Sequence, residues 1–185
     1  MLKRLRRLPS GDQAGSSLLG SLLEVVFIVG AAFVLALLIQ QFVVKPFYIP
    51  SESMEPTLVK GDRVLVNRFV YRFNDPKPGD VIVFHPPTAP EQDYIKRVVA
   101  VGGDTVEVKG GLLFVNGVAQ DEPYLNERNI EGVFPSETVP EGYVFAMGDN
   151  RNRSSDSRVF GPVKLESILG KGFVIYWPPG KIGWL

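Results

Sequence analysis

The sequence predicts a mainly antiparallel β domain preceded by one N-terminal transmembrane α-helix. A long apolar run lies near the N-terminus, and short apolar stretches with a period near two follow it. Gly, Pro, Asn and Asp separate these stretches, as is typical of strands joined by turns. At 185 residues and 45% hydrophobic content, the chain is long enough for one domain with a core and a short additional element.

The apolar run covers residues 25–44 and contains no charged side chain. A helix of this length is about 30 Å long, close to the thickness of a bilayer's hydrocarbon core. A buried globular helix would show polar residues on one face, and a cleaved signal peptide would have a shorter apolar stretch followed by small residues. We therefore expect an anchor helix over residues 21–44, preceded by a short basic segment over residues 1–20.

Basic residues gather before this run and set its expected orientation. Lys3, Arg4, Arg6 and Arg7 all precede it, and Lys/Arg bias beside a span places that end on the cytoplasmic side. We expect a single-pass protein of the plasma membrane with residues 45–185 on the extracytoplasmic side. The formal net charge is +0, which gives no reason to expect a nucleic-acid partner.

The strands expected after the anchor share period-two patterning and flanking turn residues. They cover residues 62–66, 81–84, 94–101, 105–108, 112–115, 143–147 and 173–177. Asn116-Gly117 is a strong signal for a two-residue hairpin turn. Residues 120–141 are rich in acids, Asn and Pro, and we expect them to form a long excursion between strands.

Several aromatic residues near the expected membrane interface are candidates for contact with the lipid bilayer, since amphipathic rings favour the headgroup level. They are Phe42, Phe47, Tyr48, Trp177 and Trp184. Trp177 stands inside a candidate strand, and for this residue we expect a place in the core instead.

The numbers of cysteine and histidine residues limit which nucleophiles, bases and metal sites the chain can have. The chain has no cysteine and a single histidine, His85, so it has no cysteine nucleophile, thiolate metal site or multi-histidine metal site. A serine nucleophile needs a neighbouring proton acceptor, which is usually histidine. His85 is followed by two prolines and has no obvious acidic partner, so a Ser-His-Asp triad is not expected.

Two residues remain candidates for a nucleophile and its base. Ser53 lies in the turn-rich segment IPSESMEPTL, nine residues beyond the apolar run, and nine residues reach at most about 30 Å. Serine in a turn is ordinary, and this segment alone favours a structural interpretation. Lys96 and Arg97 alternate in the apolar strand YIKRVVAV, so a basic group is drawn toward the core on either face. A desolvated lysine can become neutral, whereas arginine cannot, which makes Lys96 the candidate base.

A third polar stretch, MGDNRNRSSDSR over residues 147–158, has many side-chain donors and acceptors. Calcium sites use clustered Asp and Asn oxygens, so a metal loop is one interpretation. Three arginines stand among only two aspartates, which argues against a cation cage. We expect a hydrogen-bonded scaffold loop.

Together these stretches resemble bacterial signal peptidase I, the type I leader peptidase. The matching segments occur in the family's order and are PSESMEPTL (50–58), KGDRVLV (60–66), GDVIVF (79–84), YIKRVVAVGGD (94–104) and GDNRNRSSDSR (148–158). The family fold is mainly antiparallel β, in agreement with the strand pattern. The resemblance implies a serine endopeptidase that removes N-terminal signal peptides from exported preproteins through an acyl-enzyme, without metal or organic cofactor.

The resemblance also implies a role for each site residue. Ser53 matches the family nucleophile and Lys96 its base, while Ser51 matches an oxyanion donor beside the backbone N–H of Ser53. Ser154 matches the serine that orients the lysine. The expected scaffold residues are Arg97, Asp149, Asp156 and Arg158. Arg153 departs from the pattern, since the family more often has asparagine there.

Two alternatives stay open at this point. A self-cleaving domain with a Ser-Lys dyad resembles this family in fold, although the anchor and the lack of a DNA-binding domain speak against it. An anchored β domain that only binds a partner would fit the turn-rich loops. Proteolysis of a preprotein distinguishes both from a signal peptidase.

Overall fold

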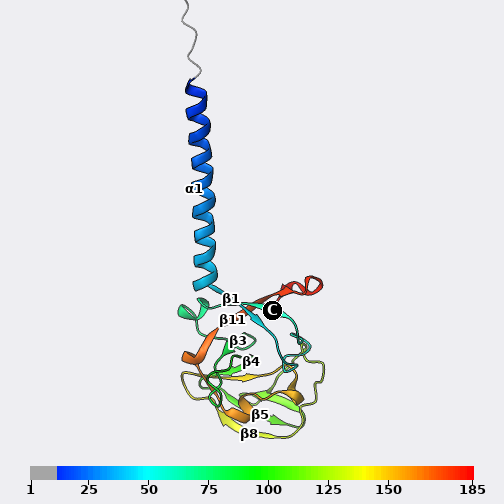
Figure 1. Ribbon diagram of the computed structural model, residues 1–185. Coiled ribbons are helices and arrows are strands. Elements are labelled where there is room, and N and C mark those ends of the chain that lie inside the picture. Colours follow the sequence, from blue (N-terminus) through cyan, green and yellow to red (C-terminus); the bar gives the residue numbers. More distant parts are fainter. Residues whose placement is uncertain (1–11) are drawn as a thin grey trace, which may run out of the picture. The chain divides into compact units, whose positions relative to one another are not determined.

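The computed structural model describes residues 12–185, which form one unit ending at Gln41 and a second comprising Phe42–Leu185. The described part of the first unit is helical and belongs to helix α1, Asp12–Phe42, whose last residue is counted with the second unit (Figure 1). Within it Gly20–Leu38 has a mean hydropathy of 2.6, and none of its side chains is buried. By length and composition this segment can cross a membrane, and no other helix within residues 12–185 can. The basic cluster of residues 3–7 lies outside the described residues.

The helix and the expected anchor differ in their boundaries. The helix begins at Asp12 and ends at Phe42, whereas the apolar pattern indicated residues 21–44. Val44 is instead the first residue of strand β1, Val44–Tyr48. No strand was expected here, because the strand continues the apolar run and contains Pro46. Proline lacks a backbone N–H, and the structure accommodates it at the edge of a sheet.

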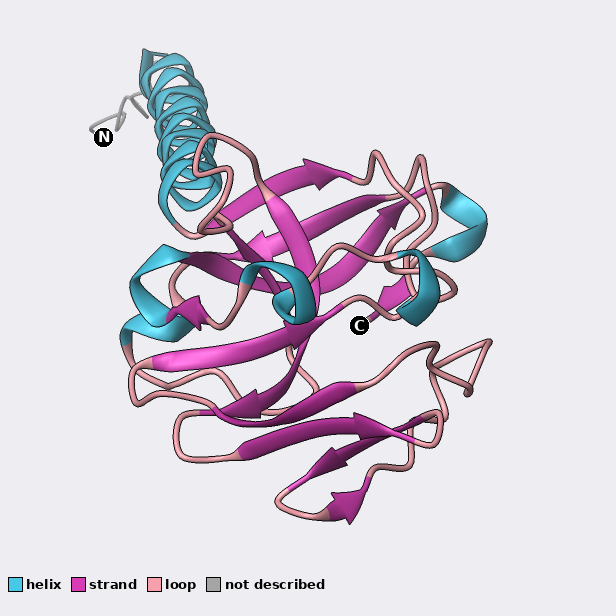
Figure 2. Ribbon diagram, turned by 90° about the horizontal axis from the view of Figure 1, so that it is seen from below, coloured by secondary structure: helices cyan, strands magenta, loops and turns pink. Residues whose placement is uncertain are grey.

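The second unit contains two antiparallel sheets (Figure 2). The larger has the order β1-β2-β11-β3-β4-β9-β10 with β12 beside β11, and the smaller has the order β7-β6-β5-β8. These pairings confirm the mainly antiparallel β class. The remaining strands are β2 Arg63–Asn67, β3 Val81–Phe84, β4 Tyr94–Val101, β5 Thr105–Lys109, β6 Leu112–Val115, β7 Val118–Ala119, β8 Phe134–Thr138, β9 Tyr143–Met147, β10 Val163–Lys164, β11 Ile168–Trp177 and β12 Gly183–Trp184.

Short helical turns connect the strands. They are α2 Ser157–Phe160 and the 3-10 turns η1 Val70–Arg72, η2 Arg151–Arg153, η3 Leu165–Ser167 and η4 Pro179–Lys181. The expected hairpin is present, since Asn116 and Gly117 have φ of 52° and 76° between β6 and β7. Both central residues of such a turn need positive φ, which Asn and Gly tolerate best.

Buried apolar side chains of the second unit hold the larger sheet around its central strands. Strand β4 lies between β3 and β9, and all of its residues except the two terminal ones are buried. One cluster joins residues of β2, β3 and β11 to the loop that follows β1, through Met54 and Leu58. This packing fixes the loop that contains Ser53 against the strand that contains Lys96.

The expectation that Trp177 belongs to the core is wrong. Its side chain is 48% exposed, at the C-terminal end of β11, with the guanidinium of Arg63 5.9 Å from its ring centroid. A strand end has fewer neighbours than a strand centre, and the chain turns away at Pro178. Trp184 and Tyr48 are also exposed, at 81% and 59%.

Candidate active site

Ser53 lies in the loop between β1 and β2. A main-chain hydrogen bond of 2.9 Å from Ile49 N to Asp62 O closes the base of this loop. Met54, the next residue, is 0% exposed and packs in the core, while Ser53 itself stays partly exposed. The loop therefore anchors its backbone through Met54 and leaves the hydroxyl of Ser53 accessible.

The amine of Lys96 reaches the hydroxyl of Ser53 from β4. Lys96 Nζ lies 2.8 Å from Ser53 Oγ and donates a second hydrogen bond of 2.9 Å to the carbonyl of Ile95. A neutral amine has one lone pair, so with an N–H directed at Ile95 its lone pair can accept the Ser53 proton. The structure thus joins the candidate nucleophile and the candidate base, which are 43 residues apart in the sequence.

Burial tunes this amine toward its neutral form. Lys96 is only 4% exposed, and desolvation lowers its pKa from the usual 10.5 to about 8. The carboxylates of Asp156 and Asp149 act in the opposite direction and keep the pKa from falling further. The ring of Tyr94, 5.4 Å from Nζ, covers the amine on its own strand. With this pKa, roughly a tenth of Lys96 is neutral at pH 7 and about half at pH 8, so the amine can serve as a base at mildly alkaline pH.

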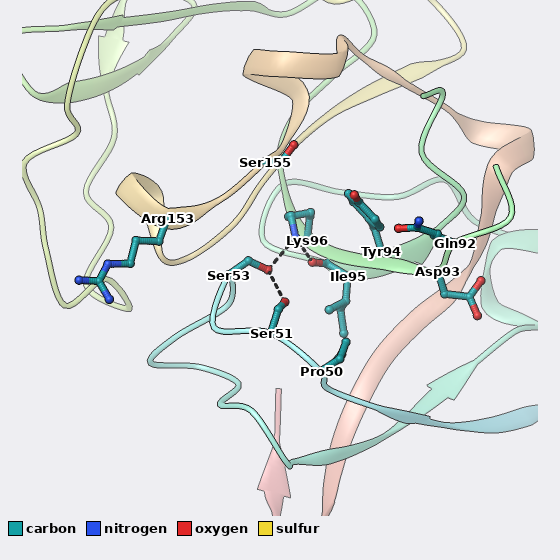
Figure 3. A pocket seen from close by; sticks show the side chains of 10 residues that line it. All are labelled: Pro50, Ser51, Ser53, Gln92, Asp93, Tyr94, Ile95, Lys96, Arg153 and Ser155. Carbon is teal, nitrogen blue, oxygen red and sulfur yellow. Dashed lines mark hydrogen bonds between the residues drawn. The ribbon is translucent and has the colours of Figure 1, made fainter. Parts of the chain in front are cut away.

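A cavity of about 380 Å³ opens over the dyad of Ser53 and Lys96 (Figure 3). Ser51 stands at its edge with its Oγ 3.3 Å from Ser53 Oγ, so a donor is available beside the nucleophile. Arg153 also lines the cavity, but its guanidinium points away from Lys96 and lies 3.8 Å from the Glu52 carboxylate.

Arg97 and Asp149 form a buried ion pair next to Lys96. Arg97 donates to both carboxylate oxygens of Asp149, at 2.9 Å from Nε and 2.7 Å from Nη2. Thr57 donates to the same carboxylate at 2.5 Å, and Arg97 also donates to Gly79 O at 2.9 Å. The pKa of Arg97 is raised by this partner despite its burial. The pair ties β4 to the loop that follows β9.

Asp156 and Arg158 organise the far side of that loop. The carboxylate of Asp156 is fully buried and accepts from Gly148 N at 3.1 Å and from Arg158 Nε at 2.9 Å. Arg158 in turn donates to the carbonyl of Arg151 at 2.5 Å. The loop has the dense hydrogen bonding of a scaffold, and the described residues contain no cluster of three or more acidic or histidine side chains that could hold a metal ion.

Ser154 lies near Ser53 on the other side of Gly148 and makes no hydrogen bond to the Lys96 amine. Its Oγ is buried and has no hydrogen-bond partner among residues 12–185, so the bond to Lys96 that the resemblance implies is not formed here. A Cβ added to Gly148 would collide with Ser154 Oγ and with the carbonyl of Ser53. Gly148 is thus required for the close approach of this loop to the nucleophile.

His85 takes no part in the dyad. Its Nδ1 lies 3.4 Å from the Asp93 carboxylate and 3.4 Å from the carbonyl of Gln92, at a partly exposed site. Asp93 lines the cavity over Ser53, but His85 does not. Asp93 is thus an acidic neighbour of His85 that the sequence did not single out, on a histidine whose ring lies outside the lining of this cavity.

Sequence reasoning missed three residues behind the site. Glu122 and Tyr124 belong to the excursion of residues 120–141, and Arg151 stands in the polar loop without an assigned role. Arg151 Nη1 and Nη2 donate to Glu122 at 2.6 and 2.7 Å, and the Tyr124 hydroxyl donates to Glu122 at 2.7 Å. A Glu and an Arg that are 29 residues apart give no pairing signal in one sequence.

Comparison with known proteins connects this geometry to a family. A family model described as "Signal peptidase, peptidase S26" matches residues 22–177. A probable signal peptidase I-1 of Synechocystis sp. is 44% identical over 161 residues, which cover 83% of this chain and 82% of that protein. The thylakoidal processing peptidase 1 of Arabidopsis thaliana is 42% identical over 164 residues, 82% of this chain and 47% of that protein. A solved structure of a signal peptidase I from Enterococcus faecalis is 37% identical to this chain and superposes with a TM-score of 0.47. The alignment covers 53% of this chain and 97% of that one.

Proposed function

Because the chain belongs to the signal peptidase family, peptidase S26, we propose that Ser53 and Lys96 form the dyad that performs its reaction. The chain is a serine endopeptidase that cleaves signal peptides from preproteins. The observation that carries the residue assignment is the 2.8 Å contact between Lys96 Nζ and Ser53 Oγ. Nucleophiles of this type lie within hydrogen-bond reach of their base.

The proposed reaction has two stages. Neutral Lys96 accepts the Ser53 proton while Ser53 Oγ attacks the scissile carbonyl, and the protonated amine then delivers that proton to the leaving amino group. The signal peptide stays esterified to Ser53. A water molecule, deprotonated by Lys96, hydrolyses the ester and restores the hydroxyl. The hydrogen bond from Nζ to Ile95 O keeps the amine oriented through both stages.

Ser51 and Ser154 complete the proposed site in different ways. We assign Ser51 Oγ and the backbone N–H of Ser53 as donors to the oxyanion, supported by the 3.3 Å separation of the two hydroxyls. For Ser154 we propose a hydrogen bond to Lys96 once substrate occupies the cavity, because its buried hydroxyl has no partner within the described residues. Four further residues fix the position of the loop of residues 148–158 against β4: Arg97, Asp149, Asp156 and Arg158.

A trapped intermediate tests the nucleophile. The protein is incubated with a preprotein, quenched in acid and examined by mass spectrometry for a signal-peptide ester on Ser53. We expect the ester in the wild type and neither ester nor cleavage in Ser53→Ala. Ser136→Ala, which changes an exposed serine of β8, is the matched control and should behave as wild type. Cleavage by Ser53→Ala would refute the dyad, and cleavage within the chain alone would indicate a self-processing domain.

We further propose that the chain is a single-pass protein of the plasma membrane with residues 45–185 outside. The apolar segment Gly20–Leu38 and the basic residues before it support this topology. Exposed Trp177, Trp184 and Tyr48 support contact of the second unit with lipid headgroups. In this topology the nucleophile is tethered beside the membrane from which an exported signal segment emerges.

The lack of native cysteine makes this topology directly measurable. We expect Ser136→Cys to react with a membrane-impermeant maleimide on intact spheroplasts. We expect Ser10→Cys, in the basic segment, to react only after the membrane is permeabilised. The reverse pattern would show that the second unit faces the cytoplasm, and labelling in another membrane fraction would exclude the plasma membrane.

A further inference from the structure

A buried polar network lies behind the loop of residues 148–151, on elements that the proposed dyad does not include. The guanidinium of Arg151 is 0% exposed and forms a double hydrogen bond with Glu122, which is itself 8% exposed. Arg151 Nε also donates to Gly148 O at 2.9 Å. A buried charge pair of this kind needs good geometry and further hydrogen bonds to offset its desolvation, and here all three guanidinium nitrogens of Arg151 donate while both carboxylate oxygens of Glu122 accept.

Tyr124 extends this network to the strand of the base. Its hydroxyl donates to Glu122 at 2.7 Å, and its ring centroid lies 4.2 Å from the guanidinium carbon of Arg97. Burial and the neighbouring Glu122 carboxylate raise the Tyr124 pKa, so the phenol remains a donor at physiological pH. Within the 120–141 excursion, Glu122 therefore contacts the loop of residues 148–151 through Arg151. Tyr124 contacts β4 through Arg97.

Residues 148–151 contact both the loop that contains Ser53 and the strand that contains Lys96. Asn150 N donates to the carbonyl of Ser53 at 3.1 Å, and Asp149 pairs with Arg97, the residue after Lys96. The Cα of Gly148 approaches the same Ser53 carbonyl too closely for a Cβ. A displacement of residues 148–151 would thus move the nucleophile and the base relative to each other.

From these contacts we propose that Glu122 and Tyr124 are positioning residues for the reaction, which fix residues 148–151 against β4 and so set the geometry between Ser53 and Lys96. The proposal rests on the dyad proposed above. It assigns a function to the first part of the 120–141 excursion. Glu122 does not line the cavity over Ser53, so it acts on the chemical step and not on substrate binding. A misplacement near 1 Å can reduce a rate by about 10²-fold.

The charges that face Lys96 give this proposal a specific pH signature. Asp149 and Asp156 from the loop raise the Lys96 pKa, and Asp93 and Arg153 line the cavity in front of the amine. When Glu122 is replaced by glutamine, the carboxylates of Asp149 and Asp156 are no longer fixed in position. Arg151 also keeps a positive charge that no carboxylate pairs. Both changes disfavour the protonated amine, so the pKa of Lys96 should fall.

The test is the pH dependence of preprotein cleavage by the full-length protein in detergent, for wild type and Glu122→Gln. Glutamine keeps the shape of the side chain and removes its charge. We expect kcat to fall about 10-fold or more with KM within about twofold, and the acidic limb of kcat/KM to move to lower pH by about half a unit. Rates are divided by the fraction of enzyme that retains the wild-type thermal transition. Asp121→Asn removes the charge of an exposed carboxylate in the same excursion, 3.8 Å from Arg128, and should match the wild type.

Each result is decisive. A Glu122→Gln protein that folds and has wild-type kcat per folded molecule and a wild-type acidic limb would overturn the proposal. If Glu122→Gln does not fold, Tyr124→Phe is the second variant, because it removes only the hydroxyl and keeps the ring on Arg97. We expect it to lose less kcat than Glu122→Gln and to move the acidic limb of kcat/KM in the same direction. Wild-type kinetics in Tyr124→Phe would then refute the proposal. Ser53→Ala is run in parallel, because its activity would refute the dyad independently of Glu122.

Discussion

Replacement of Lys96 by methionine is expected to lower kcat for preprotein cleavage by at least about 10²–10⁴-fold, the contribution typical of a general base, and by more if the base and nucleophile act as a unit. Methionine has a similar length and suits a site where Lys96 is 4% exposed, so the effect should come from the lost amine and not from a cavity. Residual turnover should depend little on pH.

The wild type should show the titration that this variant lacks. Since the neutral amine is the active form and burial lowers the Lys96 pKa to about 8, kcat/KM should rise with pH up to that value and level off above it. The folded pKa lies below the unfolded one, so Lys96 destabilises the fold below pH 8, and this cost is relieved between about pH 8 and 10.5. Lys96→Met should therefore have a higher Tm than wild type at pH 7.

Lys164→Met, at an exposed lysine of β10, is the control and should retain both the rate and the acidic limb. An acidic limb that persists near pH 8 in Lys96→Met would assign the titration to another group. Undiminished cleavage would reject Lys96 as the base.

The fold was predictable wherever strands alternate or are fully apolar. Residues 81–84, 94–101, 112–115 and 143–147 were predicted with the bounds that the structure has. Strand β8, Phe134–Thr138, was not found, because four of its five residues are exposed and only Phe134 packs inward, on Phe145. The full extent of β11 was missed because glycines interrupt its pattern at positions where other chain segments approach closely, as at Gly170 beside Asn67.

The site was predictable to a lesser extent, and for different reasons. Alternation within one apolar strand was enough to indicate that Lys96 and Arg97 are drawn into the protein, and both are buried. Ser53 looked like an ordinary turn serine until the ordered family motifs were considered together. Glu122 gave no signal, because an acidic residue in a polar segment is typical of a solvated loop. Its role follows only from the fold, which brings it to Arg151.

The second large effect is expected on stability, from Asp149→Asn. Asp149 is 2% exposed and is the bidentate partner of Arg97, which is 8% exposed. Neutralising one member leaves the other as an uncompensated buried charge, at a cost of about 3–5 kcal/mol. At about 2–4 °C per kcal/mol the Tm of the second unit should fall by about 10 °C, measured by the near-ultraviolet circular dichroism of the full chain in detergent.

The size of this loss should depend on the unpaired arginine and not on the missing carboxylate as such. The double variant Arg97→Met/Asp149→Leu removes both charges, and we expect it to be less destabilised than Asp149→Asn, because burying two apolar groups avoids the desolvation of a lone cation. Glu107→Gln breaks the more exposed pair with Lys109, whose side chain is 53% exposed, and should change the Tm little. If the double variant were the less stable protein, Thr57 and Gly79 would be satisfying Arg97 on their own, and the ion pair would matter chiefly for holding Asp149 beside the base.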